Sequence, residues 1–188
     1  MEQFYKTAKD SFKSIDMTWD SVDWPKVRTL SNDLFDAWKS GAKVFTCGNG
    51  GSASNANHLA NDFLYGISPV DGKGMKVYSL TANIAVNTCL ANDTGYENIF
   101  SKQLRTLADS DDILIILSGS GNSPNVVEAI RQAKVIGMKT HAILGFDGGK
   151  CKVLAGNAIH IPIDNMQVAE DFQMMIGHIL MLDLKGRH

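Results

Sequence analysis

The sequence predicts a three-layer α/β/α sandwich on a mainly parallel five-stranded sheet, with extra N-terminal helices. Three observations support this fold class. Short apolar runs alternate with helical patterns along the chain, the apolar runs contain few polar residues, and two strand-to-helix turns are rich in glycine and serine. Nearly continuous apolar strands that alternate with helices are typical of parallel sheets covered on both faces.

The chain has 188 residues, which fits one domain of the usual size. We expect N-terminal helices in residues 1–40, an α/β core in 41–165 and a C-terminal helix in 166–188. The expected helices cover residues 3–16, 24–40, 53–65, 82–90, 96–107, 124–136 and 166–184. The expected strands cover residues 43–47, 75–80, 112–117, 139–144 and 158–163, and residues 66–74 read as a loop.

Charge, apolar stretches and cysteine content limit the partners and the cellular location that we expect for this protein. The formal net charge is -2, and no segment concentrates Lys and Arg, so we expect no direct contact with nucleic acid. No apolar stretch approaches the roughly 18 residues that span a bilayer, and the N-terminus lacks the apolar segment of a signal peptide. Cys47, Cys89 and Cys151 are odd in number and widely spaced, which favours a reducing compartment. We therefore expect a cytoplasmic protein.

Two turns are candidate phosphate sites. GNGGS (48–52) follows the first strand and SGSGNS (118–123) follows the third, each before a helix. Helix N-termini carry a partial positive charge, glycine lets an anion approach the backbone, and serine hydroxyls donate hydrogen bonds. The alternative is that these residues serve only turn conformation and capping. The substrate-binding candidates are Asn49, Gly50, Gly51, Ser52, Ser118, Ser120, Asn122 and Ser123.

Nucleotide motifs are missing at both turns. The phosphate-binding pattern GxxxxGK[ST] does not occur, and GNGGSA does not satisfy GxGxxG. The sequence therefore favours a sugar phosphate over a nucleoside triphosphate or NAD.

Acid, base and metal-ligand candidates lie on two of the expected helices. His58 and Asp62 are four residues apart, so they share one helix face. Asp171 and His178 are nearly aligned on the closing helix, and Glu170 lies on the same broad face. His58, Asp62, Glu170 and His178 are suitable Zn²⁺ ligands if the two helices pack together. The alternative is solvated carboxylates and a hydrogen-bonded core histidine at position 178.

Four segments carry a resemblance that covers nearly the whole chain. They are CGNGGSASNANHLANDF, ANDTGYENIFSKQL, LSGSGNSPNVVEAIRQAKVIGM and EDFQMMIGHIL. Together they resemble the sugar isomerase (SIS) domain, specifically the phosphoheptose isomerase group. The resemblance implies a homotetramer with active sites at subunit interfaces, which isomerises sedoheptulose 7-phosphate to a heptose 7-phosphate for lipopolysaccharide or capsule.

The resemblance also implies roles for individual residues. Ser52, Ser118, Ser120 and Ser123 would hold the phosphate, with Asn49 in the same pocket. His58 matches a metal-site histidine and His178 the catalytic histidine.

Three positions depart from the family pattern. Asp62 stands where these isomerases carry the glutamate base, Glu170 stands where they carry glutamine, and Ala82 replaces the aspartate of a Thr-Asp pair. The departures suggest a variant substrate, a shifted base or a lost activity.

Two functional hypotheses follow. The first is a phosphosugar isomerase with Asp62 or Glu170 as base and His178 as acid. The second is a non-catalytic phosphosugar-binding or scaffold protein, of the type that associates with the bacterial replication initiator.

Overall fold

The computed structural model describes residues 1–70 and 72–187 and confirms the predicted fold class. Five parallel strands lie in the order β2-β1-β3-β4-β5. They are β1 (Lys43–Cys47), β2 (Lys76–Ser79), β3 (Ile113–Ser118), β4 (Lys139–Leu144) and β5 (Asn157–His160). Because β1 leads to β2 on one side and is flanked by β3 on the other, the winding direction of the sheet reverses between β1 and β3.

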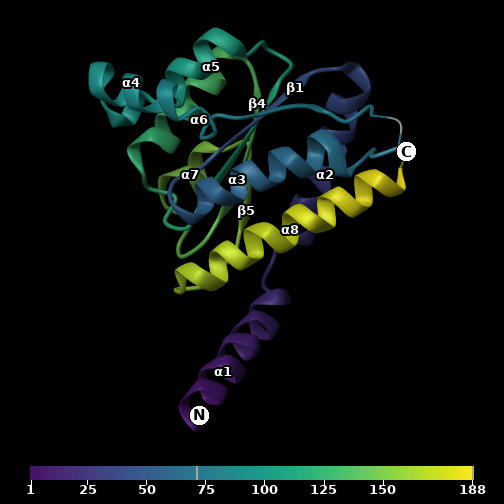
Figure 1. The fold of residues 1–188 in the computed structure, drawn as a ribbon, viewed down its shortest axis with the longest axis vertical. Helices are drawn as coiled ribbons and strands as arrows, with labels where there is room; N and C mark the ends of the chain where they lie inside the picture. The colour runs from purple at the N-terminus through teal and green to yellow at the C-terminus, as the bar shows by residue number, and fades with distance from the viewer. Residues whose placement is uncertain (71, 188) are drawn as a thin grey trace.

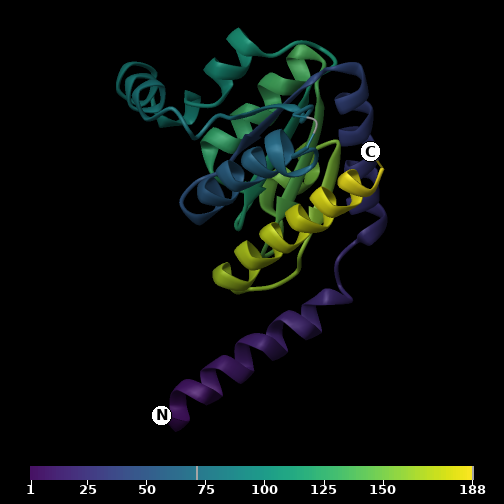
Figure 2. The ribbon, with the colours of Figure 1, turned by 45° about the vertical axis from the view of Figure 1, so that its right-hand side comes forward.

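Helices cover both faces of the sheet (Figures 1 and 2). One face carries α2 (Trp24–Ser40), α3 (Gly51–Asn61), the π-helical turn η1 (Asp62–Gly66) and α8 (Met166–Gly186). The other carries α5 (Ser101–Leu107), α6 (Pro124–Ile136) and α7 (Gly149–Leu154). On this side of the molecule η2 (Tyr96–Asn98) contacts α6, and α4 (Ile84–Thr94) contacts η2 and projects from the α/β body (Figure 2).

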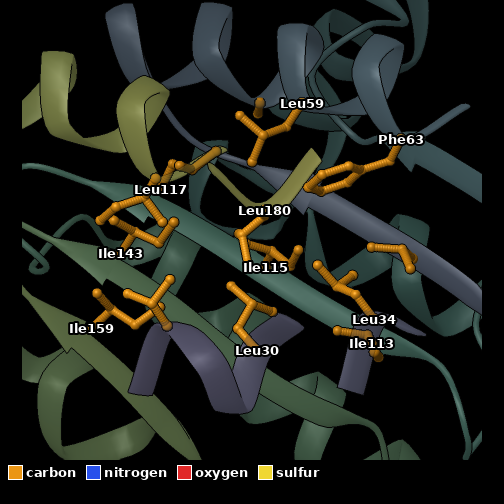
Figure 3. Close-up of a cluster of buried hydrophobic side chains, with 14 of the residues drawn as sticks. Leu30, Leu34, Leu59, Phe63, Ile113, Ile115, Leu117, Ile143, Ile159 and Leu180 are labelled. Carbon is orange, nitrogen blue, oxygen red and sulfur yellow. The ribbon is translucent and has the colours of Figure 1, made fainter. Parts of the chain in front are cut away.

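Successive side chains of each strand point to opposite faces of the sheet, so the buried core consists of two clusters, one on each face. In β3, Ile113, Ile115 and Leu117 face α2, α3 and α8, whereas Leu114 and Ile116 face the other layer. Figure 3 shows the first cluster, in which Leu30 of α2, Leu59 of α3 and Leu180 of α8 meet the strands. This packing fixes α3 and α8 as neighbours on one face.

The N-terminal helix α1 (Glu2–Trp19) extends away from the α/β body (Figures 1 and 2). Phe4, Tyr5 and Phe12 are exposed along it, and Thr18 is its one buried residue. The helix therefore leaves apolar surface uncovered in the single chain. No helix among the described residues is both long and apolar enough to cross a bilayer.

Local differences from the predicted elements have identifiable causes. Helix α7 was not expected, because its six residues begin at the second glycine of a pair and are too few to show a helical period. The expected helix 96–107 divides into η2 and α5. Strand β5 ends at His160, short of the predicted residue 163, since Pro162 lacks the N–H that would continue the ladder. Asp71 of the predicted loop and His188 of the C-terminal segment lie outside the described residues.

Candidate functional site

Both glycine- and serine-rich turns lie at the point where the winding direction reverses. GNGGS follows β1 and leads into α3 on one face, whereas SGSGNS follows β3 and leads into α6 on the opposite face. The crevice beyond the carboxyl ends of two such strands is where open α/β sheets bind ligands. The two turns that the sequence singled out are therefore neighbours at the position that the topology favours.

The SGSGNS turn keeps its serine protons available. Ser118 Oγ accepts a hydrogen bond from the Gly121 N–H at 3.0 Å, and Ser120 Oγ accepts one from the Asn122 N–H at 3.3 Å. Because a hydroxyl donates one hydrogen bond and can accept others, each of these hydroxyls still has its proton to donate. Ser123 is the N-cap of α6, where its side chain makes no capping bond. Three hydroxyl donors thus occur in the turn that leads into α6, which suits an anion.

The GNGGS turn faces α8. Gly50 has a φ of 57°, a backbone conformation that favours glycine. Buried Ser52 accepts a hydrogen bond from Gln173 Nε2 at 3.2 Å, and Asn55 Nδ2 donates to the Glu170 carbonyl at 3.0 Å. The Glu170 carboxylate packs directly over Gly51, so a side chain at position 51 would displace it. The N-terminus of α3 therefore already has a carboxylate of the same chain beside it, a favourable placement for a negative charge.

A second cluster lies further along α3 and α8. His58 Nε2 is 3.2 Å from His178 Nε2, and Asp62 Oδ2 is 3.5 Å from the first nitrogen and 3.7 Å from the second. Asp62 is nearly buried, and its Oδ2 is a buried side-chain oxygen without a hydrogen-bond partner. Asp62 also opens the π-helical turn that continues α3, a feature that recurs at functional sites.

These three side chains fit a metal ion. Their ligand atoms all lie within 4.8 Å of one another. A tetrahedral Zn²⁺ with ligands at roughly 2.0–2.1 Å separates neighbouring ligand atoms by roughly 3.3–3.4 Å. The observed separations of 3.2, 3.5 and 3.7 Å lie close to that value. Three protein ligands would leave one position open, as in catalytic zinc sites.

Glu170, the fourth predicted ligand, lies elsewhere in the single chain. It is eight residues before His178 on α8, which is about 12 Å along the helix axis. Its carboxylate contacts Gly51, whereas His178 contacts His58. One chain therefore brings together His58, Asp62 and His178 and keeps Glu170 at the turn.

The structure also reveals residues that sequence reasoning missed. Asn125, fully buried in the first turn of α6, pairs with Asn49 through both side-chain amides, and Tyr96 donates its hydroxyl to Asn49. A polar residue just inside a helix N-terminus, as in the sequence NSPN, was a signal for Asn125. Tyr96 lies in the segment ANDTGYENIFSKQL, but nothing in that segment pairs it with Asn49, so the contact could be found only in three dimensions.

Comparisons with known proteins agree with this fold. A family model described as the SIS domain matches residues 3–145. The phosphoheptose isomerase of Helicobacter pylori (strain HPAG1) is 40% identical over 183 residues, which cover 97% of this chain and 90% of that protein.

Solved structures show the same architecture. Phosphoheptose isomerase GmhA from Neisseria gonorrhoeae superposes with a TM-score of 0.89 at 26% identity, and the match covers 98% of each chain. A phosphoheptose isomerase from Francisella tularensis superposes with a TM-score of 0.88 at 25% identity, covering 100% of this chain and 98% of that one.

Proposed function

Because this chain belongs to the SIS domain family, we propose that it is a phosphosugar isomerase that interconverts the ketose and aldose forms of a sugar phosphate. Sedoheptulose 7-phosphate is the proposed substrate, since relatives at 40% identity are named phosphoheptose isomerase. The product would be a heptose 7-phosphate, for use in surface polysaccharide.

The observation that carries this proposal is the cluster of His58, Asp62 and His178. A protein that only binds a sugar phosphate needs the serine turn but has no use for a buried carboxylate oxygen between two imidazoles. Burying an unpaired carboxylate oxygen is costly, so its retention favours chemistry over a scaffold role. The non-catalytic alternative is accordingly not favoured.

The reaction needs a base, an acid and a fixed substrate. Ser118, Ser120 and Ser123 would hold the phosphate through hydroxyl protons and the N-terminus of α6. A carboxylate, Asp62 or Glu170, would remove a proton from C1 of the ketose while His178 protonates the oxygen on C2, which gives an enediol. Removal of the O1 proton and protonation of C2 would then give the aldose.

A divalent metal, Zn²⁺, is proposed at His58, Asp62 and His178 on the ligand separations given above. When bound, it would polarise the substrate carbonyl as a Lewis acid. The two imidazoles would then act as neutral ligands through Nε2, so the proton that His178 gives to the oxygen on C2 would come from its Nδ1. Asp62 would offset the charge of the ion.

A homotetramer with active sites between subunits is proposed on two observations. Tyr5, Ala8, Phe12, Ile15 and Trp19 alternate at spacings of three and four residues, which is the pattern of a helix that packs against another helix. Much of this stripe is exposed in the single chain. In addition, Glu170 can approach the His58 cluster only from a second copy, because its own chain holds it about 12 Å away along α8.

The cytoplasm is the proposed location. Cys47, Cys89 and Cys151 are free thiols, which suits a reducing compartment.

The test is NMR of the purified protein with sedoheptulose 7-phosphate and a panel of shorter ketose phosphates. New aldose resonances with any of them would support the isomerase. Sugar phosphate binding without turnover, in protein supplied with zinc, would refute the isomerase and support the binding protein. Light scattering of the same sample should give about four times the 20.5 kDa chain mass.

A further inference from the structure

The two glycine- and serine-rich turns are joined by a reciprocal pair of amides. Asn49 Nδ2 donates to Asn125 Oδ1 at 2.8 Å, and Asn125 Nδ2 donates to Asn49 Oδ1 at 2.8 Å. Asn49 belongs to the GNGGS turn after β1, and Asn125 lies in the first turn of α6 after the SGSGNS turn. The pair therefore ties together turns that lead to opposite faces of the sheet.

A third group completes the arrangement. Tyr96 of η2 donates its hydroxyl to Asn49 Oδ1 at 2.9 Å. Asn125 itself is held by a hydrogen bond from the Val126 N–H to its Oδ1 at 3.0 Å, and its side chain is fully buried. The orientation of the Asn49 amide is thus set by two side chains from other elements.

The Asn49 side chain has one hydrogen-bonding group left for a ligand. A carboxamide oxygen accepts two hydrogen bonds and a carboxamide nitrogen donates two. Asn49 Oδ1 receives both of its hydrogen bonds, from Asn125 and Tyr96, whereas Asn49 Nδ2 uses one N–H on Asn125. The unused group of the partly buried Asn49 side chain is therefore one N–H.

We infer that Asn125 and Tyr96 are positioning residues that fix the Asn49 amide so that its second N–H donates to an oxygen of the bound sugar phosphate. This inference rests on the proposed function in that it takes the ligand to be a sugar phosphate. With the amide reversed, its oxygen would face the electron-rich oxygens of the ligand and repel them. Holding a donor in place before the ligand arrives also avoids the entropy cost of ordering it on binding.

The decisive variant is Tyr96→Phe, which removes one hydroxyl from a side chain that is 55% exposed and so should leave the fold intact. Tyr78→Phe is the matched control, because Tyr78 is similarly exposed, at 49%, and lies on β2 away from the turns. We expect Tyr96→Phe to lower both kcat/KM and the calorimetric affinity for sedoheptulose 7-phosphate about fivefold, the equivalent of one hydrogen bond. The melting temperature of Tyr96→Phe should equal that of the wild type, and Tyr78→Phe should keep wild-type kcat/KM and affinity.

A double-mutant cycle tests whether Tyr96 acts through Asn49. In the Asn49→Ala background, Tyr96→Phe should have no further effect on affinity or on kcat/KM. An equal fivefold loss in both backgrounds would overturn the inference, as would no loss in either. Asn125→Asp gives a second cycle: it replaces the donor to Asn49 Oδ1 by an acceptor, and its effect should likewise disappear in Asn49→Ala.

The cycle separates this inference from the proposed isomerase activity. If the wild type binds the sugar phosphate but does not turn it over, the isomerase proposal fails while the cycle is still read from calorimetric affinity. If the wild type turns the substrate over but the Tyr96 and Asn49 effects add independently, the isomerase proposal stands and the positioning role is overturned. Absence of any sugar phosphate binding would overturn both.

Discussion

The Nε2 atoms of His58 and His178 lie 3.2 Å apart, although the residues are 120 positions apart in the sequence. Two imidazole nitrogens approach this closely only when one carries a proton or a cation lies between them, because two lone pairs repel. Asp62 Oδ2 lies within 3.7 Å of both and completes a triangle of ligand atoms. The relationship joins α3 to α8.

Zinc content should depend on this triangle. We expect about one zinc ion per chain in the purified protein, with the content falling more than tenfold in His58→Ala and in His178→Ala, since each removes one of three protein ligands. Elemental analysis after dialysis is the measurement. His160→Gln is a suitable control, because His160 lies outside the cluster and contacts the Phe146 carbonyl. Equal zinc in all four proteins would contradict the metal site.

Asp62→Asn distinguishes a ligand from a base. A base that is not a ligand should lose turnover while zinc content and substrate affinity persist, whereas a ligand should lose zinc and turnover together. Asp171 becomes the next candidate base if neither Asp62→Asn nor Glu170→Gln affects turnover.

The serine turn should dominate phosphate binding. Removing two hydroxyl donors in Ser120→Ala/Ser123→Ala should weaken sugar phosphate binding by roughly 2–4 kcal/mol, since hydrogen bonds to charged groups each contribute about 1.5–3 kcal/mol and share one anion. Calorimetry measures the change, with Ser11→Ala/Ser110→Ala as a control on exposed serines remote from the turn. A folded double variant with wild-type affinity would remove SGSGNS from the site. The dephosphorylated sugar should bind wild type far more weakly.

The sequence predicted the helices, strands and turns better than it predicted which side chains lie close together in space. The five strands and both turns follow from apolar runs and glycine-serine patterns, which are local signals. Glu170 and His178 were predicted to share one metal site because they lie on the same face of the helix. They are eight residues apart, however, and the rise along the helix axis separates them. The contact between Asn49 and Asn125 spans 76 positions. Such a pairing depends on the strand order, which no local pattern contains.

Acid should destabilise the fold through His141. This buried residue of β4 has its Nε2 3.1 Å from Asp33 Oδ2 and its Nδ1 3.0 Å from Asn157 Nδ2, which also donates to the Lys26 carbonyl. Burial lowers the pKa of His141 from 6.5 to about 4, and a proton on Nδ1 would oppose the Asn157 donor. Between these values the unfolded chain binds a proton that the folded chain does not, so stability is full above pH 6.5 and falls as pH drops toward 4.

The loss from this residue should reach about 3 kcal/mol near pH 4. Urea unfolding at pH 7, 6, 5 and 4 would measure it. We expect His141→Gln to be less stable than wild type at pH 7 but to lose less stability on acidification, while His160→Gln keeps the wild-type slope. Parallel pH profiles for wild type and His141→Gln would show that another group controls acid stability.

The position of Glu170 leads to a prediction about mixed assemblies. If Glu170 serves the His58 cluster of a neighbouring subunit, an oligomer made only of the Glu170→Ala chain, or only of the His178→Ala chain, has no intact site. In an oligomer that contains both chains, however, the two missing side chains belong to different subunits. A site that takes His178 from the Glu170→Ala chain and Glu170 from the His178→Ala chain is intact, and random pairing in an equal mixture makes roughly one site in four intact. Unfolding and refolding the two inactive variants together should therefore restore about a quarter of wild-type kcat, with substrate turnover followed by NMR.

Each variant refolded alone is the control for the procedure. A mixture of His58→Ala with His178→Ala is the control for geometry, because those two residues meet within one chain and the two variants should not complement each other. Recovery in the second control, or none in the Glu170 mixture, would place the complete set of catalytic groups differently from the arrangement proposed for this protein.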